Sequence, residues 1–337
     1  MEIKSRYPLK KYNTFGISAY AKEFVSVSST AELAGVLKEN KGKELFILGG
    51  GSNMLLTQDI DAIVIHINLK GKETISKDES YAYVKAMAGE NWHEFVLFCI
   101  DNNYGGLENL SLIPGNVGTT PIQNIGAYGT EIKDTFVSCE AMDIATQQMV
   151  TFTKEECRFA YRESIFKGEL KGKYIITSVT FRLTTNNHKI NTSYGDIAAE
   201  LTKNGISVPT IKDVSNAVTA IRQSKLPNPA ELGNSGSFFK NPIITAEEFK
   251  KVQLQHPQMP HYVVSDTEVK VPAGWLIEQS GFKGKRFGDA GVHKNQALVL
   301  VNYGNATGKE LLDLSKKIQK TVYANYGINI EAEVNII

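Results

Sequence analysis

The most informative stretch for the fold is Ile113–Gly129, which reads IPGNVGTTPIQNIGAYG. It is rich in glycine, contains Pro114 and Pro121, and carries no charged side chain. No helical or strand period runs through it. Glycine lets a ligand approach the main chain closely, proline stiffens a loop, and successive N–H groups attract anions. The stretch therefore predicts a rigid loop that binds a large planar ligand with phosphates, and the alternative is an ordinary surface loop.

A second glycine-rich segment, Gly49–Gly50–Gly51–Ser52–Asn53, follows a predicted buried strand at Leu45–Leu48. Its glycines expose successive N–H groups, and Ser52 and Asn53 add side-chain donors, which suits a phosphate. The segment is not the G-x-G-x-x-G of dinucleotide-binding folds, because residue 54 is Met, and no Gly-Lys-Ser/Thr follows as in a P-loop. A tight glycine turn is the alternative interpretation.

The composition is that of an ordinary globular protein of two or three domains, with 337 residues of which 42% are hydrophobic and 22% charged. A net charge of +1 argues against a nucleic-acid-binding or membrane-surface protein. Cys99, Cys139 and Cys157 are widely spaced without a C-x-x-C pair, so we expect reduced thiols of a cytoplasmic protein. No signal peptide, membrane span or metal-ligand spacing is expected.

The pattern of apolar residues and turn signals divides the chain into three segments, at residues 1–69, 70–208 and 209–337. In the first we expect strands at Glu23–Val27, Leu45–Leu48 and Ala62–Ile67, and a helix opened by the Ser29–Glu32 capping box. In the second we expect a strand at Tyr81–Ala86 and a helix that buries Trp92, Phe95 and Cys99. Farther along we expect a hairpin of Phe136–Ile144 with Met149–Thr153, a capping box at Thr153 and Glu156, and a strand at Tyr174–Leu183. The polar stretch Thr184–Val208 is predicted to be an inserted lobe or linker.

The third segment is predicted to combine helices with short strands. We expect a helix from Ile211 to Lys225, two helices capped by Thr245 with Glu248 and by Thr307 with Glu310, and a short helix within Pro272–Gly281. We also expect a buried strand at Ala297–Val301 and a last strand near the C-terminus. In the last strand one face carries Ile328, Ile330, Ala332, Val334 and Ile336, and the other carries Glu331, Glu333 and Asn335. Together the three segments predict an α+β fold.

Several side chains are candidates for chemistry. Ser237 lies between a glycine and two phenylalanines, and it could be a nucleophile, a proton donor or a turn residue. No G-x-S-x-G motif surrounds it, which disfavours acyl transfer. Glu333 could be a general acid or an electrostatic partner, but Glu331 shares its strand face, so spacing alone does not choose between them. The candidate cations for a carboxylate or phosphate are Arg162, Arg222, Lys225 and Lys240, each of which could instead be an ordinary surface cation.

Eight stretches, spread over the whole chain and kept in order, resemble the UDP-N-acetylenolpyruvoylglucosamine reductase family, flavin enzymes of peptidoglycan precursor synthesis. They are Asn13–Gly16, Gly49–Asn53, Ile113–Gly129, Tyr161–Ser164, Lys225–Pro229, Gly236–Pro242, Ala290–Leu300 and Glu331–Val334. The Tyr194 lobe and the stretch around Tyr262 are similar to the longer of the family's two types. Met54 replaces the more usual leucine after GGGSN, which is a conservative departure.

The resemblance implies an FAD-binding domain of the vanillyl-alcohol-oxidase/PCMH-like class, with two α/β subdomains at residues 1–69 and 70–208. Residues 209–337 would form an α+β substrate domain whose last strand returns toward the flavin. FAD would be bound non-covalently, NADPH would be the reductant, and no metal is implied. The substrate would be UDP-N-acetylglucosamine enolpyruvate, reduced to UDP-N-acetylmuramate by a cytoplasmic monomer.

The resemblance also assigns roles to residues at matching positions. Ser237 would give a proton to the α carbon of the enolpyruvyl group, after hydride from reduced FAD reaches the β carbon. Arg162 and Glu333, rather than Glu331, would stabilise the enolate. The cofactor-binding residues would be Gly49, Gly50, Gly51, Ser52, Asn53, Pro114, Gly115, Gly118, Thr119, Gln123, Asn124, Gly126, Ala127, Tyr128 and Gly129. The residues binding the substrate or NADPH would be Tyr194, Arg222, Lys225, Asn241, Tyr262 and Gln296.

Two other functions compete with this one. The first is an FAD-dependent sugar or alcohol oxidase of the same fold; many of these tether FAD through His or Cys near the first glycine loop, and His66 is the nearest such residue here. The second is a nucleotide-sugar binding protein without turnover. The presence of Ser237, Arg162 and Glu333 together argues against a protein that only binds.

Overall fold

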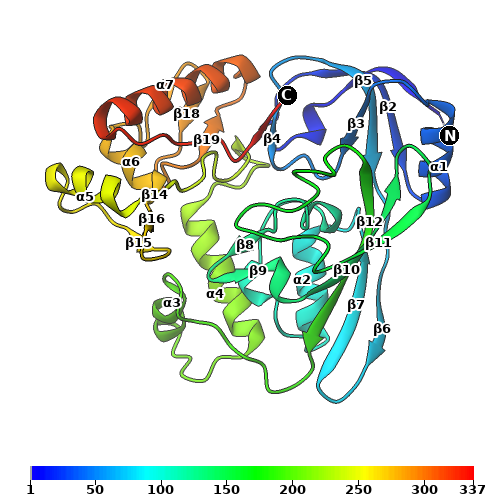
Figure 1. Cartoon of the computed structure of the whole chain (residues 1–337), viewed down its shortest axis with the longest axis horizontal. Helices are drawn as coiled ribbons and strands as arrows, with labels where there is room; N and C mark the ends of the chain where they lie inside the picture. Colours follow the sequence, from blue (N-terminus) through cyan, green and yellow to red (C-terminus); the bar gives the residue numbers. More distant parts are fainter. Residues whose placement is uncertain (1) are drawn as a thin grey trace. The chain divides into compact units, whose positions relative to one another are not determined.

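The computed structural model describes residues 2–337, which group into two compact units (Figure 1). Unit 1 comprises the N-terminal residues up to Tyr7 together with Ala21–Gly50 and Asp61–Arg222, and unit 2 comprises Pro8–Tyr20, Gly51–Ile60 and Gln223–Ile337. The chain therefore leaves unit 1 twice before its C-terminal region completes unit 2. The finer division into three segments, with boundaries at residues 69 and 208, stays a prediction.

A four-stranded sheet that belongs mainly to unit 1 has the order β1-β2-β5-β3. Its strands are β1 (Lys4–Pro8), β2 (Tyr20–Val27), β3 (Leu45–Leu48) and β5 (Ile60–Ile67), of which β3 and β5 run parallel. Helix α1 (Thr30–Glu39) begins after Ser29, whose side chain accepts a hydrogen bond from the Glu32 N–H. Its apolar face, which includes Leu33, packs against the strands. The predicted strands and capped helix of this segment are confirmed.

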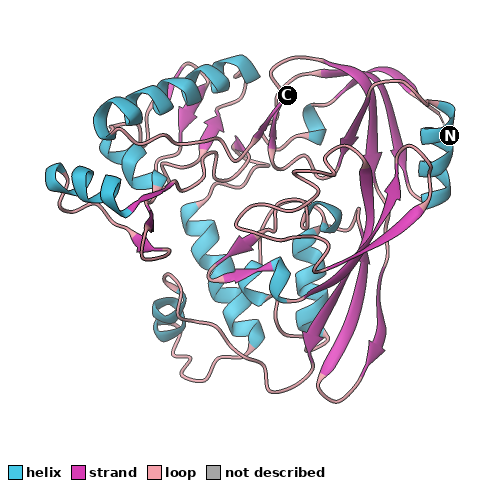
Figure 2. Ribbon diagram, viewed as in Figure 1, coloured by secondary structure: helices cyan, strands magenta, loops and turns pink. Residues whose placement is uncertain are grey.

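A larger antiparallel sheet in unit 1 has the order β11-β10-β12-β7-β6 and forms the long strands of Figure 2. Its members are β6 (Lys72–Lys77), β7 (Tyr81–Met87), β10 (Phe136–Asp143), β11 (Met149–Thr153) and β12 (Tyr174–Thr184). Helix α2 (Trp92–Asp101) packs on it through fully buried Trp92, Phe95 and Cys99. The predicted hairpin is confirmed, with Ser138 opposite Thr153. All three cysteines are free and buried.

Helices α3 (Ile197–Lys203) and α4 (Ile211–Lys225) complete unit 1 as far as Arg222. They share a small apolar cluster that includes Ile197, Leu201 and Val218. The predicted span of α4, from Ile211 to Lys225, is confirmed. The polar stretch before α4 is therefore a lobe with its own helix and core contacts, rather than a bare linker.

The described part of unit 2 includes two sheets of three or four strands and the α-helices α5, α6 and α7. The first sheet has the order β13-β19-β18-β17, with β13 (Gly233–Asn234), β17 (Arg286–Phe287), β18 (Ala290–Val292) and β19 (Leu300–Asn302). The second has the order β14-β16-β15, with β14 (Ile243–Thr245), β15 (Tyr262–Val263) and β16 (Glu268–Lys270). The helices are α5 (Ala246–Gln255), α6 (Ala273–Gln279) and α7 (Gly308–Tyr326), and the predicted capping boxes of α5 and α7 are present.

The short elements lie in the connections. They are the 3-10 helices η1 (Lys10–Tyr12), η2 (Glu108–Leu110), η3 (Val117–Thr119) and η4 (Ile132–Asp134), and the two-residue strands β4 (Met54–Leu55), β8 (Gly126–Ala127), β9 (Thr130–Glu131) and β20 (Asn335–Ile336). No helix within residues 2–337 has the length and apolar character needed to span a bilayer.

Three predicted elements differ in the structure. The buried strand expected at Ala297–Val301 begins only at Leu300. The Thr153–Glu156 pair forms both capping hydrogen bonds, at 2.7 and 3.4 Å, but turns rather than a helix follow it.

The last strand is the third and largest difference. Only an isolated bridge between Ala332 and Phe239 and the short β20 are regular, and Ile336, which the alternation places on the apolar face, is 43% exposed. The segment bonds first with residues 238–240 and then with residues 53–55, so no single ladder continues along it. Ile328, Ile330 and Val334 of the same predicted face are buried.

Candidate functional site

The loop Ile113–Gly129 is fixed to the start of α2 and the end of β7. The Trp92 N–H donates to the Gly115 carbonyl at 3.0 Å, and the N–H groups of Val117 and Gly118 donate to Glu90 and Ala88 at 2.9 and 3.0 Å. A Cβ on Gly118 would lie 2.4 Å from the Cβ of Ala88, so only glycine fits there. These contacts make the loop rigid, as its composition indicates.

The first glycine run packs directly against this loop. A Cβ on Gly49 would lie 2.7 Å from the Thr119 methyl, and one on Gly50 would lie 2.8 Å from the Asn116 amide oxygen and 3.1 Å from Gly115 Cα. Within the described residues, the N–H groups of Gly50, Gly115 and Asn116 donate to no protein acceptor. Two touching main chains with available donors form a cradle that suits a diphosphate. Asn116 was not among the predicted cofactor residues, although it stands in the same stretch.

Gly51, the third glycine of the run, is the first residue of the segment Gly51–Ile60 that belongs to unit 2. Gly51 has φ +62°, and a Cβ there would lie 1.9 Å from the Tyr12 carbonyl oxygen. The Thr14 N–H donates to the Gly51 carbonyl at 3.1 Å, and Asn13 closes its own loop by bonding the main chain of Leu9 and Ile17. The stretch Asn13–Gly16 therefore supports Gly51, and both belong to unit 2.

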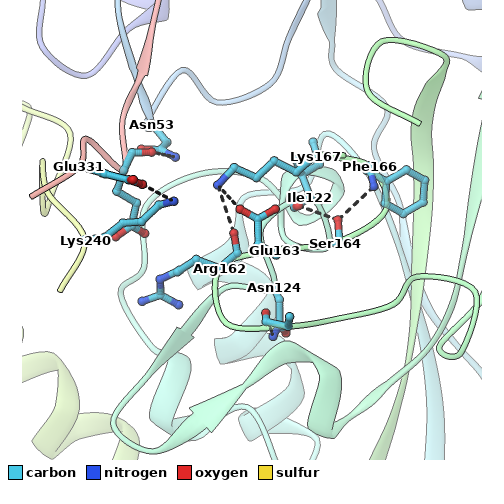
Figure 3. Close-up of polar contacts among 12 residues, drawn as sticks. Asn53, Ile122, Asn124, Arg162, Glu163, Ser164, Phe166, Lys167, Lys240 and Glu331 are labelled. Carbon is cyan, nitrogen blue, oxygen red and sulfur yellow. Dashed lines mark hydrogen bonds and ion pairs between the residues drawn. The ribbon is translucent and has the colours of Figure 1, made fainter. Parts of the chain in front are cut away.

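Arg162 projects from a tight turn in unit 1 (Figure 3). Ala160 and Glu163 exchange main-chain hydrogen bonds of 3.1 and 3.2 Å across the turn, and Arg162 between them has φ +58°. Its Nη2 donates to the Gly126 carbonyl at 2.8 Å, and Lys167 Nζ donates to the Arg162 carbonyl at 3.1 Å. A left-handed conformation at a non-glycine residue is costly and is typical of functional sites.

The same turn is attached to the loop by side chains that Figure 3 labels. Asn124 Nδ2 donates to the Ala160 carbonyl at 3.0 Å, and Ser164 Oγ donates to the Ile122 carbonyl at 2.6 Å. Asn124 is buried and has φ +45°. Its assignment as a cofactor residue comes from the family resemblance, and its observed hydrogen bond to Ala160 holds the Arg162 turn in place.

A second guanidinium lies in the same region of unit 1. Arg222, on α4, is half-buried, and its Nε donates to the Leu112 carbonyl at 3.2 Å. Burial lowers the pKa of Arg222, the nearby Tyr128 opposes that change, and Arg162 adds to it. Arg162, Arg222 and Tyr128 are thus close enough to interact electrostatically. Unit 1 brings these three predicted residues together beside the Gly126–Gly129 end of the loop, where they favour an anionic ligand.

Ser237 belongs to unit 2 and is exposed. Gly236 before it has φ +67°, and Phe238 after it is fully buried, with its N–H donating to the Leu298 carbonyl at 2.8 Å. Within residues 2–337 no hydrogen bond restrains the Ser237 hydroxyl. By contrast, Ser235 is buried, and its hydroxyl donates to the Met54 carbonyl at 3.3 Å. Ser237 is therefore available to a ligand, whereas Ser235 is structural.

Glu333 lies beside this segment in unit 2. Its N–H donates to the Phe238 carbonyl at 2.8 Å, and the Lys240 N–H donates to the Glu331 carbonyl at 2.9 Å. Asn53 Nδ2 also donates to the Glu333 carbonyl at 3.4 Å. Glu333 is half-buried, but the Glu331 side chain is 78% exposed and pairs loosely with Lys240 at 3.7 Å, as Figure 3 shows. The two glutamates are thus distinguished by burial, which sequence spacing could not do.

Among the other predicted substrate residues of unit 2, two accept main-chain hydrogen bonds and two are exposed. Asn241 Oδ1 accepts a hydrogen bond from the Ala273 N–H at 2.9 Å and caps α6, and Gln296 Oε1 accepts one from the Leu298 N–H at 3.3 Å. Lys225 is exposed at the end of α4, and its main chain bonds the ring of His293. Tyr262 is 51% exposed on β15, with Lys270 Nζ at 5.7 Å from its ring centroid.

Comparison with known proteins gives two family matches. Residues 228–337 match the C-terminal domain of UDP-N-acetylenolpyruvoylglucosamine reductase, and residues 21–153 match an FAD binding domain. The first match covers the segment with Ser237 and Glu333, and the second covers both glycine-rich loops.

Matches to relatives extend over the whole chain. The UDP-N-acetylenolpyruvoylglucosamine reductase of Flavobacterium johnsoniae is 70% identical over 337 residues, covering 100% of both chains. The enzymes of the same name from Chromobacterium violaceum and Amoebophilus asiaticus are each 47% identical, covering all of this chain and 99% and 100% of theirs.

Solved structures agree on the fold. The UDP-N-acetylenolpyruvylglucosamine reductase of Thermus caldophilus aligns with a TM-score of 0.69 at 24% identity, covering 100% of this chain and 99% of the other. A solvent-stable cholesterol oxidase aligns with a TM-score of 0.50 at 11% identity, covering 98% and 86%. With the FAD-binding match, these alignments confirm the expected fold class, an oxidase-like FAD-binding domain joined to a C-terminal domain.

Proposed function

The chain belongs to the UDP-N-acetylenolpyruvoylglucosamine reductase family, and from this membership we propose how its own residues carry out the reaction. The protein is an oxidoreductase that uses FAD and NADPH to reduce the enolpyruvyl group of UDP-N-acetylglucosamine enolpyruvate, and the product is UDP-N-acetylmuramate for peptidoglycan synthesis. The observation that carries this conclusion is full-length identity of 70% to a reductase of this name.

The geometry of unit 1 is compatible with FAD. The cradle offers the main-chain N–H groups of Gly50, Gly115 and Asn116, and a Cβ on Gly49 or Gly50 would collide with the facing loop, so the cradle suits the pyrophosphate. The remaining predicted cofactor residues of the loop extend from the cradle to Gly129. Bound FAD would supply the hydride-transfer chemistry that links NADPH to the enolpyruvyl group.

Three side chains would act on the substrate itself. Ser237, whose hydroxyl has no protein partner among the described residues, would deliver a proton to the α carbon. A serine hydroxyl is a poor acid near neutral pH, so its position must compensate for its pKa. Arg162, in unit 1, and Glu333, in unit 2, would stabilise the enol or enolate that forms. Burial supports Glu333 over Glu331 for this role.

The remaining predicted residues would bind the substrate or NADPH, the two ligands binding in alternate half-reactions. Lys225 and Arg222 would bind negatively charged groups, and Asn241 and Gln296 would contribute their amides. Tyr194 and Tyr262 are both largely exposed, at 45% and 51%, and would cover the bound diphosphate. We further propose that the protein is a cytoplasmic monomer that requires no metal, nucleic acid or membrane.

An anaerobic absorbance titration tests this function. The purified protein should show a bound flavin spectrum that bleaches with NADPH and recovers when the enolpyruvyl sugar nucleotide is added. Recovery only with oxygen would instead indicate an oxidase. The flavin should also be released on denaturation, because His66, the residue nearest for a covalent link, lies within β5 with its Nδ1 2.9 Å from the Ser26 hydroxyl. Retained flavin would contradict non-covalent binding.

A further inference from the structure

One buried side chain connects the loop Ile113–Gly129, here called the flavin-side loop, to the lobe that carries Tyr194. Asn109, in η2, is only 2% exposed, and its Nδ2 donates to the carbonyls of Tyr128 at 3.1 Å and Asn191 at 3.0 Å. An amide nitrogen carries two hydrogens, so one side chain can serve both acceptors. The two carbonyls also define the orientation of the amide, because Oδ1 in that place would face two acceptors. Asn109 therefore joins two loops that lie far apart in sequence.

Further contacts carry this connection to Tyr194. Asn191 Nδ2 donates to the Gly129 carbonyl at 3.5 Å, and Asn191 Oδ1 accepts from the N–H and hydroxyl of Ser193 at 3.2 and 2.9 Å. A Cβ on Gly129 would lie 3.3 Å from the Cβ of Tyr194. Tyr194 is thereby placed against the end of the flavin-side loop.

The lobe has little apolar burial at this point. Residues 193–196 are all exposed, whereas Ile197 at the start of α3 is fully buried. Main-chain segments with few buried apolar contacts open at low cost in free energy. The polar connection through Asn109 is therefore a major restraint on residues 191–196.

We propose that Asn109 is a positioning residue for Tyr194, which it holds on the Tyr128–Gly129 loop before a diphosphate-bearing ligand binds. Ordering the lobe in advance reduces the conformational entropy lost on binding, and this improves affinity without changing the chemical step. The proposal rests on the role that the proposed function gives Tyr194, and it adds a residue that touches neither substrate nor cofactor.

Asn109→Ala in the holoenzyme removes both donors and leaves two carbonyls without their partner. We expect KM for the enolpyruvyl sugar nucleotide to rise on the order of tenfold, since a lost buried hydrogen bond has an effect of about this size. The value of kcat and the FAD content should stay near those of the wild type. Amide hydrogen exchange at residues 191–196 should become faster. A purely structural role would instead lower the FAD content or kcat.

Two other variants make the test specific. Asn40→Ala removes a comparably buried amide, 4% exposed, whose Nδ2 donates to the Val36 carbonyl at 2.9 Å at the end of α1. It should change neither KM nor exchange at residues 191–196. Asn191→Ala removes the side-chain hydrogen bonds of Asn191 to Gly129 and Ser193. Because Asn191 is only half-buried, this variant does not disturb the core, and it should reproduce the KM increase.

A double-mutant cycle with Tyr194→Ala shows whether Asn109 acts through that tyrosine. If it does, Asn109→Ala should raise KM little further once Tyr194 is gone. Additive effects, an unchanged KM in both single variants of the connection, or unchanged exchange at residues 191–196 would each overturn the proposal. Failure of the proposed function would look different, because the wild-type enzyme would then not reoxidise its flavin with the sugar nucleotide at all.

Discussion

The main-chain N–H of Glu333 donates a hydrogen bond to the carbonyl of Phe238 at 2.8 Å, which places this glutamate beside the residue that follows Ser237. The two positions are far apart in sequence but lie in the same unit. Phe238 is fully buried and Glu333 is half-buried, so the hydrogen bond holds the main chain of Glu333 against the segment that carries the exposed Ser237. This proximity gives the proposed proton donor and charge stabiliser a shared structural basis.

Ser237→Ala should separate the two half-reactions. Flavin reduction by NADPH should be close to wild type, but reoxidation by the sugar nucleotide should slow by about a hundred- to ten-thousand-fold, the usual contribution of a positioned proton donor. Anaerobic stopped-flow absorbance measures both rates. Ser235→Ala is the control, since that buried hydroxyl bonds the Met54 carbonyl and should affect stability rather than reoxidation. Equal losses in both half-reactions for Ser237→Ala would remove its assignment.

Glu333→Gln and Glu331→Gln should differ sharply although the residues are two positions apart. The first should slow substrate-dependent reoxidation by about a hundredfold, in line with the loss of one group that stabilises transition-state charge. The second should have almost no effect, because the Glu331 side chain is 78% exposed and its pairing with Lys240 is loose, at 3.7 Å. Similar rates for the two variants would show that the enolate is not stabilised by Glu333.

Gly50→Ala should weaken FAD binding. The added methyl group would lie 2.8 Å from the Asn116 amide oxygen and 3.1 Å from Gly115 Cα, so the two loops must separate. Overpacking costs about 1–3 kcal/mol, which corresponds to an affinity loss on the order of ten- to a hundredfold. The ratio of flavin to protein absorbance after gel filtration measures it. Gly35→Ala, in α1 with nothing within 4 Å of the added Cβ, should retain FAD fully.

Stability should fall as the pH is lowered from neutral, partly because of His93. Burial lowers the pKa of His93 below its ordinary 6.5, and Nδ1 accepts a hydrogen bond from the Leu112 N–H at 3.0 Å, which requires an unprotonated nitrogen. Below pH 6.5 the unfolded chain takes up a proton that the folded chain resists, so the free energy of unfolding decreases as pH falls through the window between the two pKa values.

His93→Asn keeps an acceptor near the Nδ1 position but cannot be protonated in this range. The fall in Tm between pH 7 and pH 5 should therefore be smaller in the variant, although burial also lowers the pKa of His66 and His293, which maintain part of the slope. An identical Tm profile for wild type and variant would show that His93 does not contribute.

The sequence by itself determined the elements whose signals are local. Three capping pairs begin helices as predicted: Ser29–Glu32, Thr245–Glu248 and Thr307–Glu310. Helix α4 ends at Lys225, and strands β10 and β11 pair as the predicted hairpin. These features depend on residues three or four positions apart, or on two neighbouring strands. The eight family stretches identified the fold and reaction for a similar reason, since each is a contiguous run of residues.

Only the tertiary structure decided which of these segments touch. Gly50 meets Asn116, Asn109 joins Tyr128 to Asn191, and Glu333 rather than Glu331 is half-buried beside the Ser237 segment. The last strand is shorter than its alternation predicts because its main chain changes partner from residues 238–240 to residues 53–55. The physical reason is that irregular main chain must satisfy its N–H and carbonyl groups with whatever the fold brings near, and no period in the sequence encodes that partner.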